Sequence, residues 1–264
     1  MQILNIAAYR FVALGDLPAL QAKVRESLQS RRILGTVLLA EEGINVFLAA
    51  EPAAIHDFLA WLRADPRFAG LAVKESWSEA QPFRKLLVKV KGEIIRMNHT
   101  AIRPTADATG RAPAVDALTL KRWLDDGHDD EGRPVVTLDT RNAFEVDVGT
   151  FRGAIDWRID KFTEFPQALL DHRDELAGKT VVSFCTGGIR CEKAALFMRD
   201  AGVDHVYQLD GGILGYFEKF PATDGSAHFD GACFVFDARR GVDAALAPSV
   251  EPSRTAQDEA SSDS

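Results

Sequence analysis

One segment constrains the fold more than any other: residues 180–193 read TVVSFCTGGIRCEK. An apolar run of strand-forming residues passes through two glycines into a helix-forming run. A strand that is apolar on both faces and leads directly into a helix is typical of a parallel sheet covered by helices. Apolar runs at 134–141 and 205–212, with a helical pattern at 116–127, continue this alternation. We therefore predict an α/β domain with a parallel sheet over residues 115–221.

Cys185 follows the predicted strand, at the sheet edge where α/β domains bind their ligands. A helix starts within a few residues, so its positive end lies near the sulfur. Gly187 and Gly188 have no Cβ, which lets the loop turn its amides inward, and Arg190 either faces a bound anion or turns into a salt bridge. We predict that Cys185 is a low-pKa nucleophile; the alternative is a buried, inert cysteine. The predicted anion loop comprises Thr186, Gly187, Gly188, Ile189 and Arg190.

Three neighbouring residues are secondary candidates. Cys191, on the first turn of the helix, is either a resolving thiol or second sulfur carrier, or a small packing side chain. Asp139 and Arg141 end a strand beside the loop; the simpler interpretation is that Asp139 caps backbone amides and Arg141 pairs with an acid such as Glu145. Four residues separate the cysteine from the arginine of the loop, one fewer than in cysteine phosphatases. The smaller loop suits a sulfur-sized group better than a phosphate ester.

The first 97 residues alternate strand and helix patterns in the order β-α-β-β-α-β. Asp16 is the predicted N-cap of the first helix, and the connection from Glu41 to Gly43 suits a hairpin. This order predicts a ferredoxin-like domain over residues 1–97, with the topology of acylphosphatases. Acylphosphatase activity is excluded, because it needs a glycine-rich loop after the first strand and this stretch offers only Gly15.

Two segments have too few large apolar residues to form a core. Residues 98–114 are rich in Thr, Ala, Pro and Gly, which predicts a linker between the domains. Residues 222–264 form a C-terminal extension, and we expect disorder from about residue 241, where Ser, Pro, Ala, Asp and Glu dominate.

Charge is unevenly distributed along the chain, whose net charge is −8. Residues 1–100 carry a net +3, residues 101–220 a net −6 and residues 221–264 a net −5. A polyanion would therefore meet the N-terminal domain first. On an alternating strand Lys85, Lys89 and Lys91 share one face, which suits either phosphate contacts or an ordinary solvated surface. The RNA-binding candidates are Arg84, Lys85, Lys89, Lys91 and Arg96.

The remaining composition bears on compartment and metals. Three cysteines, an odd number, favour reactive thiols in a reducing compartment over a disulfide framework. No apolar run is long enough to span a membrane and the first residues lack a signal-peptide pattern, so we expect a cytoplasmic protein without a membrane partner. None of the six histidines lies at ligand spacing from another His or Cys, so we expect no metal site.

Residues 115–221 resemble a rhodanese domain. The matching stretches are Asp139-Thr140-Arg141, Glu145, Gly149, Phe151 to Ala154, the loop Cys185 to Arg190, and Leu209 to Gly212. Over about residues 1–240, with Glu41 to Asn45, Cys185 to Lys193 and Cys233 to Asp237, the chain is similar to the oxygen-dependent tRNA uridine hydroxylases. Longer relatives carry further cysteine pairs that look metal-binding, and this chain has none.

The resemblance implies conversion of the wobble uridine of tRNA to 5-hydroxyuridine, with dioxygen as co-substrate, no evident cofactor and Cys185 as the active-site cysteine, which carries a persulfide in rhodaneses. Two alternatives remain open. One is a sulfurtransferase that takes sulfur from thiosulfate or a persulfide donor. The other is a non-catalytic rhodanese module that holds an anion or a partner, which the intact cysteine disfavours.

Overall fold

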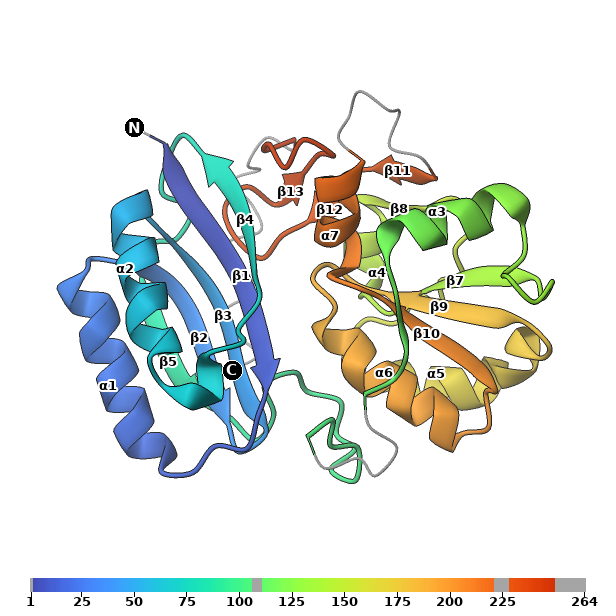
Figure 1. Cartoon of the computed structure of the whole chain (residues 1–264), viewed down its shortest axis with the longest axis horizontal. Coiled ribbons are helices and arrows are strands. Elements are labelled where there is room, and N and C mark those ends of the chain that lie inside the picture. Colours follow the sequence, from blue (N-terminus) through green and yellow to red (C-terminus); the bar gives the residue numbers. More distant parts are fainter. Residues whose placement is uncertain (1, 106–110, 221–227, 250–264) are drawn as a thin grey trace.

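The computed structural model describes residues 2–105, 111–220 and 228–249, which form two α/β units side by side (Figure 1). The N-terminal unit contains β1 (Ile3–Phe11), α1 (Leu17–Ser30), β2 (Leu34–Ala40), β3 (Gly43–Ala50), α2 (Pro52–Arg63), a short 3-10 turn (Pro66–Phe68), β4 (Val73–Ser78) and β5 (Leu86–Val90). Its sheet has the order β4-β1-β3-β2-β5, antiparallel except for the parallel β2–β5 pair. The predicted ferredoxin-like order is confirmed, with β5 as an additional edge strand.

The two faces of this sheet have different surroundings. Leu4, Ile6 and Ala8 of β1 point into the core beneath α1 and α2, as does Val88 of β5. The residues that alternate with them, such as Tyr9, lie on the opposite face, which looks toward the second unit. The sheet therefore presents one face without covering helices to the C-terminal half of the chain.

Two local features of the N-terminal unit concern its turns. Asp16 is at the N-cap position of α1, but its backbone is left-handed (φ 49°) and its side chain caps no amide, so the predicted side-chain cap is wrong. The β2–β3 connection is a tight hairpin in which Ala40 pairs with Gly43. A Cβ on Gly43 would lie 2.1 Å from the carbonyl oxygen of Arg10, so β1 can approach only a glycine there.

The second unit contains β6 (Ala114–Val115), α3 (Ala117–Asp126), β7 (Val135–Asp139), α4 (Ala143–Val146), β8 (Gly149–Phe151), α5 (Phe165–His172), β9 (Thr180–Phe184), α6 (Ile189–Asp200), β10 (His205–Leu209) and α7 (Gly212–Lys219), with short 3-10 turns at Phe162–Glu164 and Arg173–Leu176. Its sheet is entirely parallel, in the order β6-β10-β9-β7. One core lies between the sheet and α3 with α7, and the other between the sheet and α5 with α6. The predicted parallel α/β sheet is confirmed.

The predicted linker is more closely packed than its composition indicates. Ile102 and Ala112 are buried in the core beneath α5 and α6, together with Met97. Ala114 already belongs to β6, which pairs with β10. The ends of this segment are therefore part of the second unit, and residues 106–110 lie outside the described residues.

The C-terminal extension contains β11 (Phe229–Gly231), β12 (Cys233–Phe234) and β13 (Gly241–Val242). β11 pairs with β8, and β12 pairs with β13. Val242 and Ala244 are buried in the core beneath α3 and α7, so the prediction of disorder from about residue 241 is wrong for residues 241–249. The remainder of the predicted disordered segment, 250–264, lies outside the described residues.

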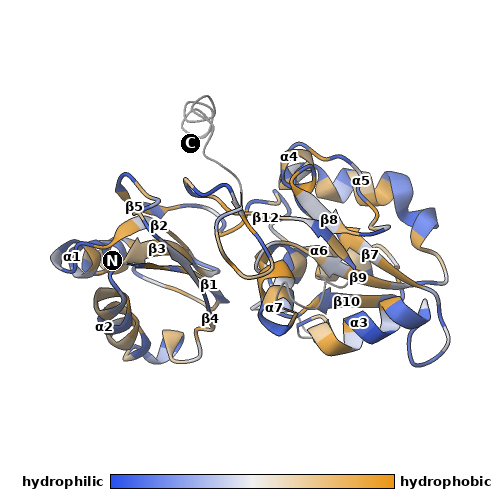
Figure 2. Cartoon of the chain, turned by 90° about the horizontal axis from the view of Figure 1, so that it is seen from above, coloured by the Kyte–Doolittle hydropathy of each residue, from blue (hydrophilic) through white to orange (hydrophobic). Residues whose placement is uncertain are grey.

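The extension also lies between the two units, as Figure 2 shows for β12. The Ala238 amide donates to the Pro82 carbonyl, and Arg239 Nη1 donates to Ser76 Oγ at 2.7 Å. This segment therefore connects the second unit to the β4–β5 region of the first. Among the described helices, none has the length and apolarity needed to cross a bilayer.

Candidate active site between the two domains

Cys185 lies directly after β9, and its side chain is within hydrogen-bond distance of the loop that begins α6. The Gly188 amide donates to Cys185 Sγ at 3.1 Å. Gly188 is the N-cap of α6 and has a left-handed backbone (φ 99°), a conformation that favours glycine. The sequence therefore builds this sulfur site from a strand end, a glycine turn and a helix N-terminus.

The surroundings of Cys185 favour the thiolate. Burial raises the pKa of Cys185, but a hydrogen bond from the Cys191 thiol, the positive charge of Arg190 and the backbone amides of Arg190 and Gly188 lower it to about 6. At neutral pH the sulfur is therefore mainly an anion, although only 1% of the residue is exposed.

The other two cysteines have the opposite tendency. Burial and the neighbouring Cys185 raise the pKa of Cys191 well above its ordinary value. Burial raises the pKa of Cys233 to about 12. Of the three, only Cys185 lines the cavity between the two units that is described below, so it is the thiol that a molecule bound there would meet.

Arg190 forms a salt bridge through its guanidinium group, which resolves the alternatives left by the sequence. Its two terminal nitrogens contact both carboxylate oxygens of Glu145 at 2.6 and 2.7 Å, and both side chains are buried. Arg190 thus acts on the sulfur through its backbone amide and its nearby charge.

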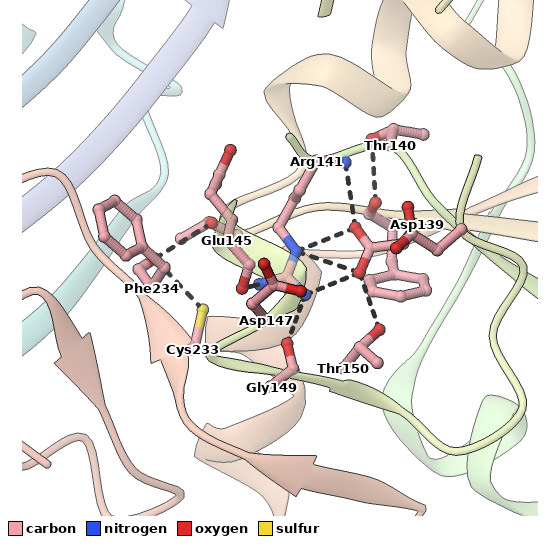
Figure 3. Close-up of polar contacts among 12 residues, drawn as sticks. Asp139, Thr140, Arg141, Glu145, Asp147, Gly149, Thr150, Cys233 and Phe234 are labelled. Atoms are coloured by element: carbon pink, nitrogen blue, oxygen red, sulfur yellow. Dashed lines mark hydrogen bonds and ion pairs between the residues drawn. The ribbon is translucent and has the colours of Figure 1, made fainter. Parts of the chain in front are cut away.

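Asp139 and Arg141 form a second buried ion pair, with 2.7 Å between Asp139 Oδ2 and Arg141 Nη2 (Figure 3). Arg141 also donates to the Gly149 carbonyl at 2.6 Å, and Asp139 accepts hydrogen bonds from the Arg141 amide and from Thr150. The expected capping by Asp139 is present, and Arg141 pairs with an acid as expected. That acid is Asp139 and not the suggested Glu145, whose carboxylate contacts Arg190. Neither residue lines the cavity; together they join the end of β7 to β8.

A cavity of about 1060 Å³ opens in front of the loop, between the two units. The rhodanese-like unit contributes Cys185, Thr186, Gly187, Ile189 and Arg190 to its wall, and the open sheet face contributes Asn5, Tyr9, Phe11, Asn45 and Phe47. The extension adds Val235, Phe236, Asp237 and Arg239. A volume of this size accommodates a nucleotide.

Tyr9 was not identified as a site residue by the sequence, yet it contacts the loop that follows Cys185. Its hydroxyl donates to Glu192 Oε1 at 3.2 Å, and a Cβ on Gly188 would lie 2.9 Å from the same hydroxyl. Burial and the negative charge of Glu192 raise the pKa of Tyr9, so the phenol stays protonated. Arg111 Nε donates to Glu192 at 2.7 Å. The only signal in the sequence is the alternation of the first strand, which places Tyr9 opposite the residues of the helix-covered core.

Lys193 joins the two units from within α6. Its ammonium nitrogen lies 2.8 Å from Glu42 and 2.7 Å from Glu93, and it donates to the Ile95 carbonyl at 3.1 Å. Lys193 is 1% exposed, so this is a buried ion cluster between domains. The available sequence signal was a lysine immediately before the apolar run of residues 194–198 in this helix.

The predicted RNA-binding residues do not form one site. Arg84, Lys85 and Lys91 are exposed along β5 and its ends, and Lys89 is half-buried. Of the five candidates, only Arg96 lines the cavity. Further basic side chains that the sequence did not single out line it as well: Arg10, Lys74, Arg111, Lys161 and Arg239.

Comparisons with known proteins agree with this division of the chain. Residues 3–94 match the UPF0176 acylphosphatase like domain family, and residues 117–219 match the Rhodanese-like domain family. Solved structures similar to the second half include a rhodanese-like domain from Anabaena, at 22% identity and a TM-score of 0.34, which covers 45% of this chain and 79% of that chain.

Curated relatives match almost the whole chain. A tRNA uridine(34) hydroxylase from Bordetella pertussis is 65% identical over 246 residues, which cover 93% of this chain and 98% of the relative. Another from Variovorax paradoxus is 64% identical over 249 residues, which cover 94% and 90%. The chain therefore belongs to the tRNA uridine(34) hydroxylase family.

Proposed function

We propose that the protein hydroxylates C5 of the wobble uridine in tRNA, with dioxygen as co-substrate and Cys185 as the reactive group. The observation that carries the proposal is a reactive thiol in a cavity enclosed by both domains, in a chain about two-thirds identical to named tRNA uridine(34) hydroxylases. Both domains line the cavity, as expected where the activity belongs to the whole chain.

A thiolate suits this reaction because C6 of a uracil ring is electrophilic. Addition of the Cys185 sulfur to C6 makes C5 a carbon nucleophile, which then combines with dioxygen. Loss of the C5 proton and release of the sulfur restore the ring double bond and leave a hydroperoxide at C5. Two further electrons cleave its O–O bond, which gives the C5 hydroxyl and water. The pKa of about 6 keeps the attacking form of Cys185 present at neutral pH.

The base must leave the anticodon-loop stack to reach Cys185, and an aromatic cluster at the cavity favours this. Phe236 lines the cavity. Phe236 and the neighbouring Phe144 are each about half exposed. Ring centroids of Phe144 and Phe236 each lie within 5.2 Å of Phe234. Unstacked bases bind to such aromatic side chains. Phosphate contacts by the exposed Lys85 and Lys91 are part of the proposal as an outer RNA surface.

A sulfurtransferase remains the second candidate, supported by the same low-pKa thiol in a rhodanese-like loop. It requires a sulfur donor such as thiosulfate and predicts a persulfide on Cys185.

Because the tRNA of growing cells is cytoplasmic, the hydroxylase proposal also implies a cytoplasmic protein.

Nucleoside mass spectrometry of tRNA separates the two candidates. Cells without the gene should lack 5-hydroxyuridine and keep their thiolated nucleosides; the wild-type chain and Cys233→Ser should restore the hydroxylation, whereas Cys185→Ser should not. Growth under labelled dioxygen should place the label in the new hydroxyl. Restored hydroxyuridine labelled from water, or loss of thiolated nucleosides alone, contradicts the proposed function.

A further inference from the structure

Two thiols meet behind the cavity wall. Gly188 holds both residues: its amide donates to Cys185 Sγ at 3.1 Å, and its carbonyl accepts from the Cys191 amide at 3.0 Å. The nearby Cys191 thiol also contributes to the lowered pKa of Cys185. Cys191 lies one turn into α6. Its sulfur is 3.8 Å from Thr140 Oγ1, and this hydroxyl donates to the carbonyl of Phe184, the residue before Cys185. Both sulfurs are therefore held at the end of the same strand.

The two sulfurs differ in access. Cys185 lines the cavity, whereas Cys191 is fully buried and does not line it. A molecule in the cavity therefore meets Cys185 and not Cys191. This is the arrangement of a reactive thiol with a resolving thiol behind it.

The proposed hydroxylation requires two electrons in addition to those of the C5–H bond, because one oxygen atom of dioxygen enters the base and the other leaves as water. On the basis of the proposed function, we propose that Cys185 and Cys191 supply these electrons as a dithiol and become a disulfide in each catalytic cycle. The balance is uridine C5–H, dioxygen and two thiols giving C5–OH, water and one disulfide.

The steps assign a role to each sulfur. Dioxygen adds to C5 of the Cys185 adduct and forms a hydroperoxide; loss of the C5 proton then restores the C5–C6 double bond as the S–C6 bond breaks, which frees the Cys185 thiolate. This thiolate takes the distal peroxide oxygen. The O–O bond breaks, leaving the C5 oxyanion, which is protonated, and a sulfenic acid on Cys185. The Cys191 sulfur then attacks the Cys185 sulfur; the S–S bond forms, and hydroxide leaves with the Cys191 proton as water. Cellular thiols that enter the cavity reduce the disulfide by attack at Cys185, the sulfur that lines it.

The first test requires no hydroxylase activity. Purified full-length protein is equilibrated in buffers of reduced and oxidised dithiothreitol, thiols are trapped with acid and iodoacetamide, and peptides are mapped by mass spectrometry. A Cys185–Cys191 linked peptide is expected in the wild type and in Cys233→Ser, and is lost in Cys191→Ser. Failure to form this link in any buffer overturns the proposal, whether or not the protein is a hydroxylase.

The second test follows a single turnover of reduced protein with tRNA and dioxygen in the absence of other thiols. Hydroxyuridine and the Cys185–Cys191 disulfide should appear in equal amounts in the wild type. In Cys191→Ser, dimedone should trap a sulfenic acid on Cys185. Cys191→Ala should give the same adduct, which excludes an effect of the serine hydroxyl. Hydroxyuridine formation with both thiols still free overturns the dithiol proposal and leaves the proposed function intact. Absence of hydroxyuridine from complemented cells counts against the proposed function instead.

Discussion

The low pKa of Cys185 depends on a few residues around a strand end. The strand, the two glycines and the following helix were recognisable in the sequence, since each has its own residue pattern. The partner of Arg190 was not recognisable, because any nearby acid in the folded chain could have paired with it. Glu145 is 45 positions away and meets Arg190 only because α4 and α6 converge at the loop.

Alkylation of Cys185 should follow the fraction of thiolate. Its pKa is about 6, so the rate with iodoacetamide should rise from pH 5 to pH 7 and level off above. Cys233, with a pKa of about 12, should react slowly over this range. Mass-spectrometric mapping of adducts against pH measures both. A Cys185 midpoint near pH 9, or labelling of Cys233 at an equal rate, contradicts this account of the loop.

Gly188 is the residue of the loop that tolerates substitution least. A side chain there would adopt a left-handed conformation, which costs about 1–2 kcal/mol, and would approach the Tyr9 hydroxyl to 2.9 Å. Gly188→Ala should therefore lower the melting temperature and slow alkylation of Cys185. Gly187→Ala is the matched control, because nothing lies within 4 Å of its added Cβ and its φ is not in the left-handed range. Equal effects of the two variants would mean that loop flexibility, not Gly188 geometry, is required.

At the scale of elements, local pattern predicted the strands and helices of the first unit, including the hairpin at Glu41 and Glu42. In the second unit it predicted α3, β7, β9, α6 and β10, but not β6, α5 or α7. The predictions failed where structure depends on distant partners. The segment after residue 240 lacks a pattern of its own, yet Val242 is buried because β12 supplies a strand to pair with. Short strands that add to an existing core leave too little periodicity to detect.

Truncation distinguishes the ordered part of the extension from the rest of the tail. A chain ending at Arg240 loses β13 and the buried side chain of Val242, which should lower the free energy of unfolding by about 2–3 kcal/mol. A chain ending at Ser249 retains these contacts and should unfold like the full chain. Urea unfolding of the three proteins measures the difference. Equal stability of the chain ending at Arg240 would show that β13 contributes no net free energy.

The basic edge of β5 can be tested as an RNA surface. Lys85→Glu with Lys91→Glu should weaken tRNA binding and lower the slope of log affinity against log salt by about 1 per lost phosphate contact. Lys23→Glu, an exposed residue of α1 on the other side of the sheet, is the charge-reversal control. Fluorescence anisotropy with labelled tRNA at several salt concentrations gives both quantities. Unchanged affinity and slope would restrict the RNA to the cavity and its basic side chains.

At the scale of the molecule, the decisive feature is the contact between the domains, which no local pattern predicts. Ile189 of the loop packs with Ala40 and Ile94 of the first domain, and Tyr9 lies against the same loop. Each domain could be predicted separately from the sequence. The cavity could not, because it depends on how the two domains are placed relative to one another. The site is therefore a property of the whole chain, although its reactive cysteine lies in the second domain.

Lys193 tests how far the site depends on this contact. Lys193→Met leaves Glu42 and Glu93 facing each other in a mostly buried place, and loss of one partner of a buried ion cluster costs about 3–5 kcal/mol. Lys121→Met, which removes only an exposed i,i+4 pair, should change the unfolding free energy little. Hydroxyuridine in complemented cells should fall with Lys193→Met and persist with Lys121→Met.

A triple variant separates loss of charge balance from loss of the lysine itself. Adding Glu42→Gln and Glu93→Gln to Lys193→Met removes the uncompensated carboxylates, so a large part of the lost stability should return. If the lysine only holds the domains together, hydroxyuridine should return together with the stability, because both domains again form the cavity wall. Recovered stability without recovered hydroxyuridine would show instead that the charge of Lys193 acts on the reaction in the cavity, and that docking of the two domains is not sufficient for activity.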